Sequence, residues 1–219
     1  MIAKYMIYYT VMAFIGYIYE CTAMTLWLGR WDNRGFLYGP VIPIYGIGSL
    51  VGSILFIKYL PDPSPLLVFL AGMMGSAVLE YPVHYLIEKY LHTSYWDYSR
   101  SPLNLHGRIC LPAAVGFGIS ALIIVHVINP LLIPWIESLP DRLVNTMAVL
   151  SGVILILDIL YSLKRLKSGN PRLDAAEEKI DRTMTTFAGR YLKEHEGLHN
   201  LFFAAVDWIC SVFGRNPES

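Results

Sequence analysis

The chain has 219 residues, of which 55% are apolar and 16% are charged, whereas about 25% of the residues in a typical soluble domain are charged. Its 17 Lys and Arg residues balance 17 Asp and Glu residues, so it lacks the basic excess that attracts nucleic acid. The composition argues against an ordinary soluble domain, and we expect no nucleic-acid partner.

Five stretches are long and apolar enough to cross a bilayer, because a helix rising ~1.5 Å per residue needs about 20 residues to cross a ~30 Å hydrocarbon core. They are 5–28, 41–60, 65–90, 109–136 and 143–163. Residues 109–136 contain no Asp, Glu, Lys or Arg, which is atypical of a helix in a soluble bundle. The sequence therefore predicts an all-α fold, a polytopic integral membrane bundle of about five transmembrane helices.

The charges are concentrated after the fifth stretch. Residues 164–219 hold 9 basic and 8 acidic residues, and the 163 residues before them hold the other 17. We predict a transmembrane bundle over 1–163 and a charged tail over 164–219. Within the tail, apolar residues recur at helical spacing over 198–213, which favours an amphipathic helix on the membrane or on the bundle, with a sixth crossing as the alternative.

The short loops indicate an orientation. If the fifth helix ends in the cytoplasm, eight Lys and Arg residues lie on that side and three lie on the other, and positive charge is retained inside. The sequence thus predicts an outside amino terminus and a cytoplasmic tail. The eight cytoplasmic residues are Arg30, Arg34, Lys89, Arg100, Arg108, Lys164, Arg165 and Lys167, and the three others are Lys4, Lys58 and Arg142.

Several ionisable residues lie inside the predicted spans, where each costs about 2.5 to 3.5 kcal/mol on insertion scales. They are Glu20, Glu80, His84, Glu88 and Asp158. A partner or a water-filled cavity must offset that cost. For Asp158 we expect a structural pairing with Lys164 or Arg165.

A series at four-residue spacing runs along the last part of the third span and just beyond it, from Glu80 through His84 and Glu88 to His92. Side chains four apart on a helix are neighbours, so the series fits a divalent metal, a proton or substrate-binding face, or simply solvation of the helix end and hydrogen bonding between helices. Each four-residue step advances slightly more than one turn of the helix, so three such steps drift around its surface and the four residues cannot all face one ion. We expect no metal. The three cysteines (Cys21, Cys110 and Cys210) show no CxxC pair and predict neither a disulfide framework nor a zinc site.

Two loops on the predicted cytoplasmic side, residues 29–40 and 96–112, share a pattern: a Trp-Asp pair, an Arg beside a Gly, and a Pro before the next helix. A guanidinium held there by a carboxylate can present its planar fork to phosphate or carboxylate. The alternative is an interfacial aromatic belt with arginines on lipid phosphates. We expect Glu20 or Glu80 to contact Arg34 or Arg108, since an unpaired carboxylate at that depth would be neutralised or expelled.

The motifs Asn33-Arg34-Gly35-Phe36-Leu37-Tyr38-Gly39-Pro40, Leu79-Glu80-Tyr81, Trp96-Asp97-Tyr98-Ser99 and Asn104-Leu105-His106-Gly107-Arg108 occur in this order. Together they resemble the bacterial family catalogued as ABC transporter permeases of the CmpB type, and more distantly vertebrate transmembrane protein 229. The resemblance covers roughly residues 5–163 and implies a multi-pass protein of the bacterial cytoplasmic membrane. Where many members carry Asn-Ile-Asn-Gly-Arg or a similar run, this chain has His106.

Three functions remain open. The first is a permease that binds and translocates a small substrate, an anion by expectation, through a polar cavity at the cytoplasmic side. The others are a membrane enzyme acting on a lipid or lipid-linked substrate, with His106 or Glu80 as base, and a non-catalytic scaffold. The candidate substrate-binding residues are Glu20, Asn33, Arg34, Tyr38, Glu80, Tyr81, Glu88, Trp96, Asp97, Asn104, His106 and Arg108.

The expected partners follow from what the chain lacks. It has no GxxxxGK[ST] phosphate-binding loop, so an energising ATPase would be a separate subunit, and five helices would form a path most readily as a homodimer. The bilayer is the remaining partner. We expect no cofactor.

Overall fold

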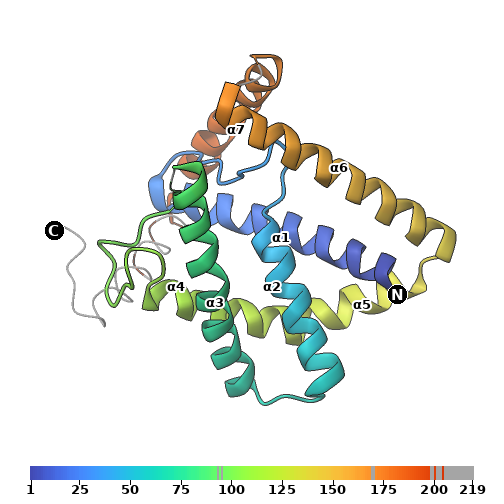
Figure 1. Cartoon of the computed structure of the whole chain (residues 1–219). Coiled ribbons are helices and arrows are strands. Elements are labelled where there is room, and N and C mark those ends of the chain that lie inside the picture. The colour runs from blue at the N-terminus through green and yellow to red at the C-terminus, as the bar shows by residue number, and fades with distance from the viewer. Residues whose placement is uncertain (93, 95, 169–170, 198–199, 201–203, 205–219) are drawn as a thin grey trace. The chain divides into compact units, whose positions relative to one another are not determined.

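The computed structural model describes residues 1–92, 94, 96–168, 171–197, 200 and 204 (Figure 1). These residues contain no β-strand beyond an isolated bridge between Leu105 and Ile109, which confirms the predicted all-α class. The helical elements in chain order are α1 (Ile2–Leu28), α2 (Pro43–Ile54), the π-helical segment η1 (Leu55–Tyr59), α3 (Pro65–Leu91), α4 (Leu111–Ile123), the π-helical segment η2 (Ile124–Ile128), α5 (Asn129–Ser138), α6 (Asp141–Ser168) and α7 (Pro171–Glu194).

Three of the described helices are long and apolar enough to cross a membrane: Pro65–Leu91, Leu111–Ser138 and Asp141–Arg165. They coincide with the third, fourth and fifth predicted spans, and the membrane class of the protein is thereby confirmed. The first predicted span corresponds to α1, and the second to α2 with η1, a shorter apolar helix. The count of five crossings stays a prediction.

The chain forms two compact units. Unit 1 comprises residues 1–14 and 42–157, and unit 2 comprises residues 15–41 and 158–219. The first half of α1 and most of α6 belong to unit 1, whereas their remaining turns belong to unit 2. The predicted amphipathic helix over 198–213 and Cys210 fall outside the described residues, apart from positions 200 and 204.

Helices α3 and α4 form the most extensive contact between helices in unit 1. Small residues permit it: a Cβ built on Gly72 would lie 2.5 Å from Ala121 Cβ, 3.0 Å from Phe117 O and 3.1 Å from Gly118 Cα. Lipid tails are as apolar as the helices, so close backbone approach and van der Waals packing hold such helices together. Local sequence determines where α3 begins: Ser64 Oγ accepts the Leu67 N–H at 3.3 Å, and Pro65 occupies the first turn.

The predicted span over 109–136 is interrupted by the π-helical segment η2, which ends one residue before Asn129. The proline at position 130 has no N–H, and in a regular α-helix its ring would collide with the carbonyl four residues earlier. A wider π turn removes that collision. The interruption places Asn129, with only 4% of its surface exposed, at the start of α5.

Candidate functional site

In unit 2, the first predicted loop is anchored by α6. The Asp158 carboxylate accepts the Tyr38 N–H on Oδ1 at 2.9 Å and the Gly39 N–H on Oδ2 at 2.8 Å. Ser162 Oγ lies 3.3 Å from the same Tyr38 nitrogen. Two backbone N–H groups of the loop therefore stabilise the Asp158 carboxylate at this depth. The charge pattern of the sequence did not identify this role of Asp158.

The arginine of this loop is paired with carboxylates. Arg34 Nε lies 3.5 Å from Glu20 Oε1, and Arg34 Nη1 lies 3.5 Å from Asp32 Oδ2. The Glu20 contact confirms one of the expected pairings. The Asn33 amide oxygen accepts both the Tyr17 hydroxyl and the Gly35 N–H, at 3.2 and 3.1 Å, so the turn around Arg34 is fixed from both sides.

Reversing the charges of Arg34 and Glu20 is expected to show how much this ion pair contributes to stability. The side chains of Arg34 and Glu20 are 20% and 25% exposed, which is intermediate between a surface and a buried pair. The single variants Glu20→Arg and Arg34→Glu should each lower the unfolding free energy in detergent by about 1 to 2 kcal/mol. The double variant should recover part of that loss in thermal unfolding. A double variant no more stable than the worse single one would show that the two charges do not interact.

Tyr38 is the last of the predicted site residues in unit 2. Its hydroxyl donates to Asp174 Oδ1 of α7 at 2.8 Å, and the Arg165 guanidinium lies 4.8 Å from its ring centroid. Partial removal from solvent and the neighbouring Asp174 carboxylate raise the pKa of Tyr38 above its ordinary value.

In unit 1, the second predicted loop is held in shape by hydrogen bonds from its own polar side chains. Asn104 Nδ2 donates to the Ser101 carbonyl at 2.9 Å, and Asn104 Oδ1 accepts the Gly107 N–H at 3.1 Å. Gly107 has φ of +68°, and a Cβ there would lie 2.5 Å from Ser99 Oγ, so only glycine fits. Asp97 accepts the hydroxyl and the N–H of Ser99, and these bonds lower the pKa of its carboxyl group.

Arg108 connects this loop to α3. Its Nη2 donates to Glu88 Oε2 at 2.8 Å, its Nη1 donates to the Tyr81 hydroxyl at 3.0 Å, and its guanidinium lies 5.1 Å from the ring centroids of both Tyr81 and Tyr85. The hydrogen bond to Glu88 raises the pKa of Arg108 above its ordinary value. His106 Nδ1 lies 2.9 Å from the Tyr81 hydroxyl. The carboxylate on Arg108 is thus Glu88, one of the predicted site residues.

The four-residue series on α3 is divided by its surroundings. Glu80 and His84 are each 7% exposed, whereas the Glu88 side chain is 55% exposed. His84 Nε2 lies 2.9 Å from the Trp96 carbonyl oxygen, and the two rings meet edge to face. His92 ends the helix in a left-handed conformation. Across the described residues, no three His, Cys, Asp or Glu side chains are grouped closely enough to hold a metal ion.

A buried polar cluster in unit 1 joins α1, α2 and α5. The Tyr8 hydroxyl donates to Asn129 Oδ1 at 2.7 Å, Asn129 Nδ2 donates to Ser53 Oγ at 2.9 Å, and the hydroxyls of Ser53 and Tyr8 are hydrogen-bonded to each other. All three residues are 4% exposed. They form a closed ring of hydrogen bonds in the interior of unit 1. The sequence interpretation missed this cluster, although an asparagine inside a predicted span was an available signal.

A cavity of about 250 Å³ opens beside the cluster, entirely within unit 1. Tyr8 and Ser53 line it, so two members of the hydrogen-bonded ring contribute to its wall. The charged residues Lys4, Lys58 and Glu137 also line it. The wall is completed by Met1, Tyr5, Leu50, Ile54, Ile57, Ile133 and Ile136.

The predicted site residues are distributed over both units. Glu20, Asn33, Arg34 and Tyr38 belong to unit 2. The other eight, which are Glu80, Tyr81, Glu88, Trp96, Asp97, Asn104, His106 and Arg108, belong to unit 1. Within unit 1, Tyr81, Glu88, His106 and Arg108 form one connected group. None of the twelve lines the 250 Å³ cavity.

Comparison with known proteins gives one match. The model of the family described as "Putative ABC-transporter type IV" (ABC_trans_CmpB) matches residues 7–163. No curated protein and no solved structure matches the chain. The matched range includes both loops, the buried polar cluster and the cavity-lining residues apart from Met1, Lys4 and Tyr5, and it ends before α7.

Proposed function

Because the chain belongs to the ABC-transporter type IV family, we propose that it is the membrane-spanning subunit of a transporter and binds its substrate in the 250 Å³ cavity of unit 1. The protein is membrane-embedded and transporter-like; the substrate and its site are the proposal. The observation that carries it is a cavity between membrane helices whose wall includes Tyr8 and Ser53, two members of the hydrogen-bonded ring. Few, well-placed polar groups in a mostly apolar pocket are typical of small-molecule sites.

The backbone around the cavity supports the same site. The π-helical segment η1 supplies two of the lining residues, Ile57 and Lys58, and the π-helical segment η2 directly precedes Asn129. Single π-helical turns are frequent at functional sites, because the widened turn reorients side chains and frees backbone groups. Both departures from regular helix thus occur next to the polar ring.

The charges that line the cavity favour an anionic or zwitterionic solute. Lys4 and Lys58 supply two positive charges against the single negative charge of Glu137. In a site with low-dielectric walls, such an excess raises the local concentration of anions. The small volume limits the solute to a compact molecule.

The cytoplasmic-side residues predicted from sequence are proposed as a further contact for an anion. Arg108 already binds a carboxylate, and its side chain is 17% exposed against 55% for Glu88. Glu88 is therefore the partner that can move away and let a substrate anion take its place on the guanidinium. Arg34, held by Glu20 and Asp32, is the corresponding cation in unit 2.

We also propose that the amino terminus is outside, that the tail is cytoplasmic, and that a homodimer works with a separate ATPase. The basis is the distribution of Lys and Arg between loops and the absence of a phosphate-binding loop in this chain.

Lipid binding is the second candidate function, favoured by the apolar part of the cavity wall. Leu50, Ile54, Ile57, Ile133 and Ile136 would suit an acyl chain. In that case the protein would act on a lipid or a lipid-linked molecule, and the hydroxyl of Tyr8 would matter little for binding.

Native mass spectrometry of the purified protein in mild detergent separates these candidates. We expect a small co-purified molecule whose occupancy falls about tenfold in Tyr8→Phe, since that variant opens the hydrogen-bonded ring and removes a polar atom from the cavity wall. Tyr9→Phe is the matched control, because Tyr9 does not line the cavity, and thermal unfolding of both variants monitors the fold. A bound lipid that both variants retain would favour the second candidate. A wild-type protein carrying no adduct would contradict both.

A further inference from the structure

The first loop and α7 meet through a second set of contacts, all within unit 2. Asp181 Oδ1 accepts the indole N–H of Trp31 at 3.1 Å and the amide N–H of Asn33 at 3.3 Å. About two turns earlier on the same helix, Asp174 Oδ1 accepts the Tyr38 hydroxyl at 2.8 Å. Two carboxylates of the tail are thus bound by three neutral donors of the loop.

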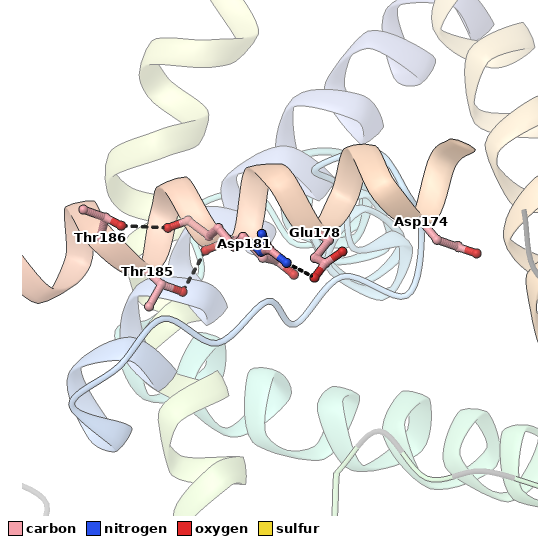
Figure 2. Close-up of a pocket in the computed structure, with 6 residues that line it drawn as sticks. Asp174, Glu178, Asp181, Thr185 and Thr186 are labelled. Atoms are coloured by element: carbon pink, nitrogen blue, oxygen red, sulfur yellow. Dashed lines mark hydrogen bonds and ion pairs between the residues drawn. The ribbon is translucent and has the colours of Figure 1, made fainter. Parts of the chain in front are cut away.

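The face of α7 that carries these carboxylates is the face that packs. Asp174 and Asp181 are partly buried and Ala188 is 6% exposed, whereas Glu178, Lys179 and Arg182 on the same helix are exposed. Figure 2 shows Asp174, Glu178 and Asp181 in succession along α7, lining an open cavity of about 610 Å³. Glu178 pairs with Arg182 of its own helix at 2.6 Å, so acidity alone does not bring a side chain to the loop.

The family match covers the hydrogen-bond donors of the loop but not the acceptors on α7. Trp31, Asn33 and Tyr38 lie inside the matched range 7–163, and α7 lies beyond it. The Asn33 donor is also positioned independently of α7: Tyr17 and Gly35 hold its amide oxygen, which leaves its N–H₂ group to donate to Asp181. Donors arranged in this way suit a carboxylate from any source.

We propose that Trp31 and Asn33 form a carboxylate-binding site that α7 occupies with Asp181 as an intramolecular ligand, while Tyr38 binds Asp174 about two turns away as a separate contact. A small free carboxylate competes with Asp181 for the Trp31 and Asn33 donors, so its binding weakens the attachment of α7 to the loop. The proposal concerns unit 2 alone and does not depend on the substrate cavity of unit 1.

Limited trypsin digestion of the full-length protein in detergent, followed by mass spectrometry, tests this site with acetate as the probe. Cleavage after Arg190 reports release of α7 and is remote from the substituted positions. We expect sodium acetate to accelerate that cleavage in the wild type, and sodium chloride at the same ionic strength to leave it unchanged. Asp181→Ala should be cleaved about tenfold faster than the wild type without acetate and should no longer respond to it.

Glu178→Ala is the matched control, since it removes an acidic side chain from the same helix without touching the loop, and it should behave as the wild type. Trp31→Phe removes a donor from the loop and leaves the sequence of α7 unchanged. It should reproduce the faster cleavage expected for Asp181→Ala. Equal responses to acetate and chloride would overturn the carboxylate site. Wild-type cleavage rates in both Asp181→Ala and Trp31→Phe would show that these bonds do not hold the helix.

Discussion

Replacing Gly72 with valine is expected to disrupt the contact between α3 and α4 and to cause a large loss of stability. Even the first added carbon would lie 2.5 Å from Ala121 Cβ and 3.0 Å from the Phe117 carbonyl oxygen. The second of these is backbone and cannot rotate away, so the helices must separate. We expect a loss of about 3 kcal/mol or more, at the upper end of overpacking effects, measured as a fall in the thermal unfolding midpoint in detergent.

Gly75→Val is the matched control for this prediction. Gly75 lies one turn further along α3, and a Cβ added there meets nothing within 4 Å. Its effect should stay within about 0.5 kcal/mol, as for ordinary surface changes. Equal destabilisation by the two substitutions would mean that the loss does not come from the close approach of α4.

Replacing Asp158 with alanine is expected to release the first loop from α6. The variant leaves the Tyr38 and Gly39 N–H groups without their carboxylate acceptor, and an unsatisfied buried donor costs about 1 to 3 kcal/mol. For two donors we expect a loss of about 2 to 4 kcal/mol, with Ser162 supplying partial compensation to Tyr38. Thermal unfolding and the yield of membrane-inserted protein would both report it.

Asp141→Ala provides the control on the same helix, since Asp141 is exposed in the first turn of α6. Its removal should cost no more than about 1 kcal/mol through the helix dipole. If Asp158→Ala proved as mild, the loop would have to be held by its other contacts, among them those of Arg34 and Tyr38.

Internal hydrogen bonding also explains why polar residues of this protein tolerate membrane depth. Asp158 binds backbone N–H groups, and Asn129 completes a ring with Tyr8 and Ser53. In each case the polar atoms are satisfied inside the protein, as hydrocarbon requires. The difference is that two members of the ring, Tyr8 and Ser53, line a cavity, and for that reason the proposed substrate site lies at the ring and not at Asp158.

Local sequence patterns predicted the helices well. Span 65–90 became α3, because Ser64 and Pro65 begin a helix by capping its first turn and a long apolar run continues it. The Glu20–Arg34 contact was likewise predictable, since a carboxylate and a guanidinium at membrane depth must find each other. The break at η2 had a visible cause in Pro130, but a proline does not reveal whether a helix kinks, ends or widens.

The amino-acid sequence by itself determined the membrane class, the positions of the long helices and the family, because these depend on composition, apolar run length and ordered motifs. Only the tertiary structure decided that Arg108 binds Glu88, that Asp158 holds the first loop, and that Tyr8, Ser53 and Asn129 meet. Tyr8 and Asn129 are 121 positions apart. Helical periodicity specifies which residues share a face, whereas the partner that each face meets is set by how closely the helices pack, and that depends on all of their side chains together.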